Sequence, residues 1–255
     1  MSTIAEMNYA KQYGPPKSSN IFLLSVIFTQ FFHVSLQLSG FYTIASYIFS
    51  KSLNHSKSFQ LILFAVLTYL LISYYSSWYQ TARTDPGHVK IVTSQFQVSQ
   101  ESGLWCKKCS TLRPARSHHC KYCKKCIENF DHHCVWALNC VGRRNKCYFY
   151  KFVVFTLIDS VWAAVCARKM PYISKFRKIC NYFPVLFSVT MVIQHTAQIC
   201  MDQTSIEARA EKLKMHGTSV RNNVHAVLSK NWLSFLLIPG KQIKYPNLLL
   251  NENLC

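Results

Sequence analysis

Long uncharged segments alternate with short basic ones along this chain. Three windows contain no Asp, Glu, Lys or Arg: residues 18–50, 58–82 and 179–201. A helix needs about 20 mostly apolar residues to cross a bilayer, so each window is long enough to hold a spanning helix. A fourth apolar stretch, Tyr148–Cys166, has Lys151 and Asp159 as its charged residues. The pattern predicts four membrane-spanning helices, of which the third has the weakest signal.

These spans predict an all-α polytopic membrane protein in five parts. In chain order the parts are a flexible tail (residues 1–20), the first two spans (21–82), a cysteine-rich domain (83–147), the third and fourth spans (148–201) and a C-terminal region (202–255). Four spans place both termini and the cysteine-rich domain on one side of the membrane. Free thiols persist in the reducing cytosol, so we expect that side to be cytosolic.

The basic residues give a mixed signal about topology. With four spans, 22 Lys and Arg lie on the predicted cytosolic side and 7 on the other side. Cytoplasmic loops usually carry the excess, so the totals agree with four spans. The segment Arg168–Lys178 nevertheless holds five of these residues, and so basic a short loop normally stays cytoplasmic. If Tyr148–Cys166 did not span, the C-terminus would be luminal, and the charges alone leave both topologies open.

The charge balance of the chain is strongly basic. Charged residues make up 15% of the chain, and 29 Lys and Arg against 10 Asp and Glu give a formal net charge of +19. A basic surface between hydrophobic spans suits an anionic membrane leaflet and a phosphate-bearing substrate. Nucleic acid is the competing partner. Because the charges lie in loops beside the spans, we expect a lipid bilayer and no nucleic acid as the partner.

A cluster of seven cysteines and four histidines lies between Cys106 and Cys140. Paired Cys-x2-Cys steps offer two thiolates to a tetrahedral zinc ion, and three such steps occur here. With Cys134 set aside, six cysteines and two histidines make two closed Cys3His sites. The count therefore predicts two zinc ions and one spare thiol.

That spare thiol ends the sequence Asp131-His132-His133-Cys134. A histidine beside a thiol takes its proton, a carboxylate fixes the tautomer of that histidine, and nearby dications favour the thiolate. This arrangement suits a nucleophile. The alternative is a wholly structural cluster, as in most modules rich in Cys and His, and the residues alone leave both interpretations open.

Together these residues resemble the DHHC family of protein S-acyltransferases (palmitoyltransferases). The matching motifs are Cys106-x2-Cys109, Arg113-Pro114-x-Arg116, His119-Cys120-x2-Cys123-x2-Cys126, Asp131-His132-His133-Cys134, Trp136, Asn139-Cys140-x-Gly142-x2-Asn145 and Phe149. Every spacing is met without insertion. The resemblance implies four spans, with the zinc domain between the second and the third.

The resemblance also implies a ligand set and a mechanism. One structural Zn2+ would be held by Cys106, Cys109, His119 and Cys126, and the other by Cys120, Cys123, His133 and Cys140. Cys134 would attack the thioester of an acyl-CoA such as palmitoyl-CoA, with His132 as general base and Asp131 orienting it. A substrate protein would then accept the acyl group on a cytosolic cysteine, in ping-pong order.

Basic residues that follow the motif are candidates to hold the CoA phosphates: Arg143, Arg144 and Lys146. Such residues are also common at membrane interfaces without a ligand. Asp159 would lie about 15 Å along a helix from Phe149, near mid-bilayer, where an ionisable group is costly. In the family the acyl chain occupies a cavity formed partly by the third helix. Asp159 is therefore expected to face that cavity and limit chain length, or to bond to His195; a neutral Asp bonded between helices is the alternative.

Other motifs lie outside the zinc domain. Asp85-Pro86-Gly87 is typical of a helix end and a turn, and the family carries it at this place. Thr204-Ser205-Ile206-Glu207 resembles the family's Thr-Thr-x-Glu and keeps the second hydroxyl, although alone it is a capping box. Near the C-terminus the family's Phe-Gly is replaced by Leu228-Ser229, which changes the packing expected there. The apolar run Trp232–Ile238 is too short to span, and we expect it to pack on the cytoplasmic face of the bundle.

The sequence thus predicts a protein S-acyltransferase of the ER or Golgi membrane, with its DHHC domain facing the cytosol. Its partners would be membrane-associated substrate proteins. One alternative is a catalytically weak zinc-dependent membrane scaffold that binds partner proteins, which the altered C-terminal element motivates. Another is a transporter with Asp159 and His195 in its pathway, which four spans and the lack of a repeat disfavour.

Overall fold

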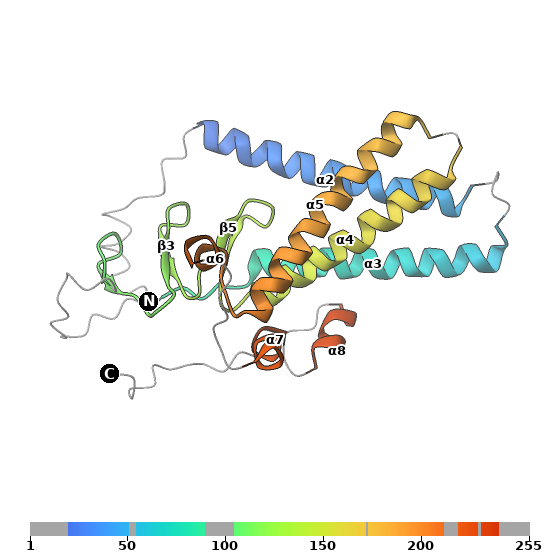
Figure 1. Cartoon of the computed structure of the whole chain (residues 1–255). Helices are drawn as coiled ribbons and strands as arrows, with labels where there is room; N and C mark the ends of the chain where they lie inside the picture. Colours follow the sequence, from blue (N-terminus) through green and yellow to red (C-terminus); the bar gives the residue numbers. More distant parts are fainter. Residues whose placement is uncertain are drawn as a thin grey trace, which may run out of the picture.

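Four long helices and a compact cysteine-rich module make up most of the structure (Figure 1). The computed structural model describes residues 20–50, 55–89, 105–171, 173–211, 219–228 and 231–239. Residues 1–19 of the predicted tail, Ser229 and the last residues of the chain lie outside this description, whereas Asn20, predicted as part of the tail, begins the first long helix. The long helices are α2 (Asn20–Ile48), α3 (Lys57–Arg83), α4 (Lys146–Lys169) and α5 (Lys175–Cys200). By length and composition α3, α4 and α5 are each able to cross a membrane.

Helix α4 lies at the centre of the bundle and packs against α2, α3 and α5. Ile44, Ile48 and Leu67 pack on Ala163 and Cys166 of α4. Large apolar side chains face outward elsewhere on α2, α3 and α5, and the most exposed include Phe28, Phe31, Leu61, Ile179 and Leu186. An apolar outer surface of this extent is typical of a protein that lies in lipid.

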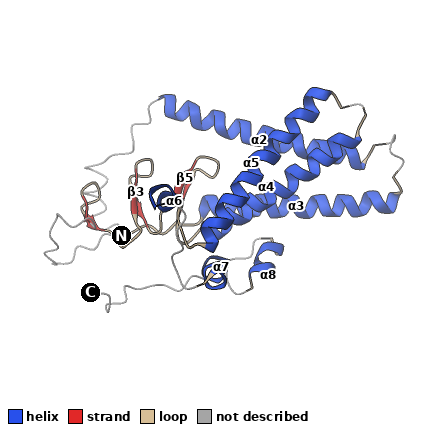
Figure 2. Ribbon diagram, viewed as in Figure 1, coloured by secondary structure: helices blue, strands red, loops and turns tan. Residues whose placement is uncertain are grey.

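The cysteine-rich module consists of three short β-hairpins between α3 and α4 (Figure 2). The antiparallel pairs are β1 (Trp105–Cys106) with β2 (Thr111–Leu112), β3 (His118–Cys120) with β4 (Lys125–Ile127), and β5 (His132–Cys134) with β6 (Asn139–Val141). The all-α class therefore describes the helical bundle but is wrong for this module.

Tight turns explain why the module forms hairpins. Each turn ends in a residue with positive φ, namely Ser110 (49°), Lys124 (57°) and Leu138 (51°). Non-glycine residues rarely adopt this conformation, so the surrounding structure must hold it in place. A positive φ at these positions reverses the chain between two antiparallel strands. The pattern of apolar residues does not predict such turns.

The described part of the C-terminal region contains three short helices beside the bundle: α6 (Ser205–Glu211), α7 (Val220–Leu228) and α8 (Trp232–Leu237). Asn223 of α7 donates from Nδ2 to the carbonyl of Cys200, at 2.8 Å. Leu228, which replaces the family's Phe, is 4% exposed and packs with Cys147 and Tyr148. The ammonium of Lys151 donates to the carbonyl of Ile238 at 2.6 Å, directly after α8. This bond joins the end of α8 to α4, while the side chains of Leu233, Leu237 and Ile238 stay about half exposed.

Candidate active site and metal centres

Two asparagines hydrogen-bond the cysteine-rich module to the end of α3. Asn139 donates from Nδ2 to the carbonyls of Thr81 and Thr84, at 3.1 and 3.0 Å. Asn145 donates to Thr81 and Cys140, at 3.2 and 2.8 Å. The last carbonyls of a helix have no partner within the helix, so these amides satisfy them. Both asparagines belong to the motif recognised in the sequence, and their role is to fix the module on the bundle.

The turn that follows α3 brings the chain back onto the module. Asp85 accepts hydrogen bonds at Oδ1 from the backbone N–H groups of Gly87 and His88, at 2.9 and 3.0 Å. Gly87 has φ of 104°, which favours glycine. Since α3 ends at Arg83, the predicted helix end and turn at Asp85-Pro86-Gly87 is confirmed.

Eight side chains form two clusters able to hold metal ions: Cys106, Cys109, His119 and Cys126 in one, and Cys120, Cys123, His133 and Cys140 in the other. Within each cluster all ligand atoms lie within 4.8 Å of one another. The imidazole Nδ1 of His133 lies 3.7, 3.4 and 3.6 Å from the three thiols of its cluster. Three thiolates and one imidazole around a common centre fit a tetrahedral structural zinc ion. The clusters contain the same residues that the sequence predicted.

The strand β5 separates the metal ligand from the reactive residues. Successive side chains of a strand point to opposite faces, so His133 points one way and His132 and Cys134 point the other. The side chain of His133 reaches the second metal cluster; His132 and Cys134 belong to neither cluster, and all three residues contribute to the cavity described below. Cys134 is 2% exposed and belongs to neither cluster. Because side chains alternate along β5, the Asp-His-His-Cys sequence contributes both to a metal cluster and to the cavity.

Asp131 is a buried carboxylate surrounded by hydrogen-bond donors. Its Oδ2 accepts from the Ser205 hydroxyl at 2.6 Å and faces Nδ1 of His132 at 2.8 Å. Its Oδ1 accepts from the Lys146 ammonium at 3.0 Å and from the Ser205 backbone N–H at 3.1 Å. With Nδ1 of His132 bonded to Asp131, the other ring nitrogen remains to exchange a proton with a neighbour.

Electrostatics favour a charged Asp131 and a protonated His132. Burial by itself raises the pKa of Asp131, but the charge of Lys146 and hydrogen bonds from His132 and Ser205 lower that pKa well below its usual range. Burial lowers the pKa of His132, yet Asp131 and the Cys134 thiol outweigh it and raise that pKa to about 9. A carboxylate that stabilises the imidazolium lets His132 hold the proton that the thiol of Cys134 loses.

Helix α6 is fixed to the module by an ion pair distant in sequence. Arg116 donates from Nε and Nη2 to the two carboxyl oxygens of Glu207, at 2.7 and 2.8 Å, and from Nη1 to Asp202 at 3.0 Å. Glu207 also accepts from the Thr204 N–H at 2.8 Å and donates its own N–H to the Thr204 hydroxyl at 3.3 Å. The Thr204–Glu207 tetrad is therefore a capping box, and it places Ser205 against Asp131.

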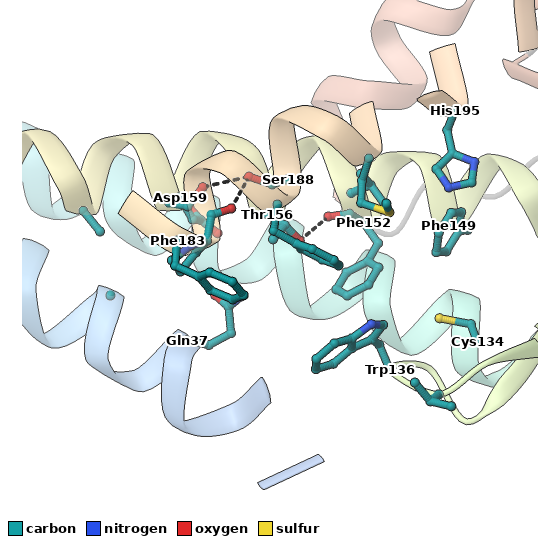
Figure 3. A pocket seen from close by; sticks show the side chains of 18 of the residues that line it. Gln37, Cys134, Trp136, Phe149, Phe152, Thr156, Asp159, Phe183, Ser188 and His195 are labelled. Carbon is teal, nitrogen blue, oxygen red and sulfur yellow. Dashed lines mark hydrogen bonds between the residues drawn. The ribbon is translucent and has the colours of Figure 1, made fainter. Parts of the chain in front are cut away.

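A cavity of about 330 Å³ begins at Cys134 and extends into the helical bundle (Figure 3). Its walls come from α2, α4 and α5 and from the β5–β6 turn. Apolar side chains form most of the wall, including Phe41, Phe152, Val153, Phe187 and Met191. The indole of Trp136 packs on Phe187 with ring centroids 6.2 Å apart, at the cavity wall. A thiol at the mouth of an apolar cavity is well placed to react with a molecule that has one polar end and one apolar end.

Two residues singled out inside the bundle line opposite ends of this cavity. The ring of His195 lies near Phe149 and His132, with centroids 4.9 and 6.0 Å apart. The carboxyl oxygens of Asp159 have no hydrogen-bond partner among the described residues. The structure therefore contradicts both the bond from Asp159 to His195 and the interhelical hydrogen bond considered as its alternative.

The three basic residues after the motif differ in their contacts. The ammonium of Lys146 donates to Asp131 and to the carbonyl of Gln203, at 3.0 and 2.7 Å. Arg144 lies 3.7 Å from Asp85 and is 41% exposed, and Arg143 is partly exposed. The contacts of Lys146 with Asp131, and of Arg116 with Glu207, were missed in the sequence. The only trace of these contacts in the sequence is a basic residue in or beside each motif.

Comparison with known proteins agrees with this site. The family model described as DHHC palmitoyltransferase matches residues 99–179. A probable protein S-acyltransferase 12 of Arabidopsis thaliana is 28% identical over 213 residues, which cover 70% of this chain and 72% of that protein. Palmitoyltransferase ZDHHC7 of Mus musculus is 32% identical over 57% of this chain and 55% of its own length. Palmitoyltransferase erf2 of Emericella nidulans is 52% identical over 26% of this chain and 11% of its length.

The family-model match includes the module that carries Cys134 and both metal clusters, and the match to the Arabidopsis thaliana protein extends over 70% of the chain. The chain spans about half or less of the mouse and fungal relatives. The chain is thus similar to protein S-acyltransferases of the DHHC family, and the family model matches its residues 99–179.

Proposed function

We propose that this protein transfers a fatty acyl group, palmitoyl in the first instance, from acyl-CoA to cysteines of membrane-associated proteins. One observation carries the proposal: Cys134 stays outside both four-ligand clusters, beside the Asp131–His132 pair, at the mouth of an apolar cavity. An acyl-CoA has an apolar chain that suits the cavity and a thioester that suits the thiol. The scaffold alternative is not favoured, because binding alone requires neither the reactive thiol nor the cavity.

In the first half-reaction the Cys134 sulfur attacks the thioester carbonyl carbon. His132 takes the thiol proton, and Asp131 orients the ring and stabilises its positive charge. The bond from the acyl carbon to the CoA sulfur breaks, and the proton passes from His132 to the departing CoA thiolate. The products are free CoA and an acyl-enzyme with the thioester on Cys134.

In the second half-reaction a substrate cysteine attacks the acyl group on Cys134. His132 takes the proton of the incoming thiol and returns it to the Cys134 sulfur when the acyl group leaves. The sequence of two displacements predicts ping-pong kinetics. Two structural Zn2+ ions on the eight clustered ligands would hold the hairpins in place, and the four ligands of each cluster leave no open position for chemistry.

The membrane arrangement that fits this chemistry has four spans, α2 to α5. The chain then places the module and the C-terminal helices on one face, which we assign to the cytosol because free thiols persist there. Arg143 and Arg144 lie at that face and would contact the phosphates of CoA. Lys146 was a third candidate, but its bonds to Asp131 and Gln203 leave it a positioning role. We assign the protein to ER or Golgi membranes on the basis of the family.

Labelling with a clickable palmitoyl-CoA tests the proposal. The purified full chain should acquire a label that hydroxylamine removes, and Cys134→Ser should not acquire it. Cys200→Ser, which changes a thiol outside both clusters and outside the cavity, is the matched control and should label as wild type does. A folded, zinc-loaded wild type that stays unlabelled would instead support the scaffold function.

A further inference from the structure

Asp159 lies at the far end of the cavity that begins at Cys134. In Figure 3, Asp159, Phe183 and Gln37 lie together at one end, and Cys134 lies at the other. The distance along α4 from Phe149, near Cys134, to Asp159 is about 15 Å at the rise of an α-helix. A chain attached to Cys134 would therefore meet this carboxyl group only with its distal part.

The carboxyl group of Asp159 is buried without a protein partner. The residue is 4% exposed, and neither carboxyl oxygen accepts a hydrogen bond from the described residues. Three neighbouring polar side chains have partners of their own: the hydroxyls of Ser160 and Ser188 lie 3.1 Å apart, and Asn181 donates to the carbonyl of Arg177 at 2.9 Å. Among the described residues no donor uses the acceptor capacity of Asp159, which leaves it available to an occupant of the cavity.

A buried acceptor without a donor is costly, and the cost is larger when the group is charged. A plain hydrocarbon terminus would leave Asp159 unsatisfied, whereas a terminus with a hydroxyl group would satisfy it. Elsewhere the cavity is different, because Phe152, Val153 and Met191 line it with apolar groups and the hydroxyl of Thr156 already donates to the carbonyl of Phe152 at 2.8 Å. The cavity thus matches a chain that is apolar along most of its length and polar at its end.

We propose that the preferred donor is an acyl-CoA whose chain carries a hydrogen-bond donor, such as a hydroxyl group, at or near its distal end, and that Asp159 accepts this hydrogen bond. The inference rests on the proposed function, since the chain enters the cavity as the group transferred to Cys134. A site that hydrogen-bonds one substrate discriminates strongly against the analogue lacking that group, because the buried polar atom is then left unpaired.

Competition between palmitoyl-CoA and ω-hydroxypalmitoyl-CoA tests this inference. The purified full chain receives both donors at equal concentration, and mass spectrometry quantifies the two acyl groups on Cys134. We expect the hydroxylated donor to load about tenfold more than palmitoyl, which corresponds to about 1.4 kcal/mol. A donor hydroxylated at mid-chain should load less than palmitoyl, because its hydroxyl would meet apolar walls.

Variants of Asp159 separate hydrogen bonding from simple size. Asp159→Leu should lose the preference for the hydroxylated donor, and Asp159→Asn, whose amide oxygen still accepts, should retain part of it. Thr68→Val removes an exposed hydroxyl of α3 outside the cavity and should leave the ratio unchanged. Zinc content equal to wild type reports that each variant is folded, and the asparagine variant decides the test if the leucine variant is not.

Three outcomes would contradict the inference: equal loading of the two long donors by wild type, a ratio that Asp159 variants leave unchanged, or a preference for a shorter unsubstituted chain over both. The last would mean that the carboxyl group acts as a barrier and not as an acceptor. Failure of every donor to load Cys134 would instead contradict the proposed function. The two failures are therefore distinguishable in one experiment.

Discussion

Two buried aspartates have opposite surroundings: Asp131 bonds to His132 at the reactive end of the cavity, and Asp159 lines its distal end. Asp131, at the reactive end, is 1% exposed and has four donor groups from Lys146, His132 and Ser205 around its two oxygens. Asp159, at the distal end, is 4% exposed and has no hydrogen-bond partner among the described residues. Burial alone therefore does not distinguish the two carboxyl groups, but their partners do.

The two carboxyl groups therefore have different expected roles: Asp131 positions His132, and Asp159 recognises the molecule that enters the cavity. The donors around Asp131 fix its place and its negative charge before any substrate binds, which is the preorganisation that catalysis requires. Asp159 has no such donors, so its interactions depend on what enters the cavity. A carboxyl group with complete protein partners is thus a candidate for the chemistry, and one without them is a candidate for specificity.

The largest effect expected from this comparison is on the rate of acylation. Asp131→Asn removes the charge that stabilises the His132 imidazolium, and the initial rate of Cys134 acylation should fall about 100-fold or more. Asp159→Asn, the same change at the other end, should leave the rate with palmitoyl-CoA nearly unchanged. The rate of Cys134 labelling by a fluorescent acyl-CoA measures both. Equal losses in the two variants would remove the distinction between the ends of the cavity.

Two glycines, Gly142 and Gly40, allow the stability of the protein to be compared between the module junction and the cavity wall. A Cβ on Gly142 would lie 2.6 Å from the carbonyl oxygen of Pro86 and 2.9 Å from that of Glu128, where backbone cannot easily move. A Cβ on Gly40, which lines the cavity on α2, would lie 3.7 Å from that of Ala163, an ordinary contact. Gly142→Ala should therefore destabilise the protein by about 1–3 kcal/mol.

Melting temperatures in detergent measure the difference between the two glycine variants. Gly142→Ala should melt several degrees below wild type, and Gly40→Ala should melt close to it. A Gly40→Ala variant as unstable as Gly142→Ala would mean that the distal end is packed as tightly as the junction between module and bundle.

The spacing of the cysteines and histidines predicted two four-ligand metal clusters, and the resemblance to the family supplied the eight residues that the structure brings together. The reactive role of Cys134 stays a prediction. Ligands separated by two residues lie on one turn, so the spacing of Cys120 and Cys123 already implies a shared centre. The apolar windows likewise predicted the positions of the long helices, because a run of about 20 apolar residues has few other stable structures. The hairpins were missed, since strands of two or three residues leave no periodic pattern to detect.

Contacts between distant segments could not be read from the sequence. Arg116 and Glu207 are 91 residues apart, and Lys146 meets Asp131 only because the module folds back onto the start of α4. The motif resemblance singled out Ser205 as a retained hydroxyl, but it did not say what the hydroxyl contacts. These pairings depend on how the module lies on the bundle, which no local pattern determines.

The Ser205 hydroxyl supplies one of the donors to Asp131 and gives a smaller expected effect. Ser205→Ala leaves the backbone N–H, Lys146 and His132 in place, so acylation of Cys134 should fall about tenfold, or about 1.4 kcal/mol in the barrier. Ser205→Thr keeps the hydroxyl that the family motif carries and should act nearly as wild type. The same labelling rate measures both variants, and a threonine variant as slow as alanine would mean that packing and not the hydroxyl matters.

The smallest effect is expected from the polar groups near Asp159 that already have partners. Ser160→Ala removes the contact with the Ser188 hydroxyl at 3.1 Å, but Ser188 still donates to the carbonyl of Pro184 at 2.7 Å. No buried donor is left unsatisfied, and hydrogen bonds between membrane helices contribute on average about 0.6 kcal/mol, so the melting temperature should change little. The ratio of hydroxylated to plain acyl chains on Cys134 should also stay at the wild-type value. If Ser160→Ala changed that ratio as strongly as Asp159→Leu, recognition at the distal end would belong to the serine pair and not to the unpartnered carboxyl group.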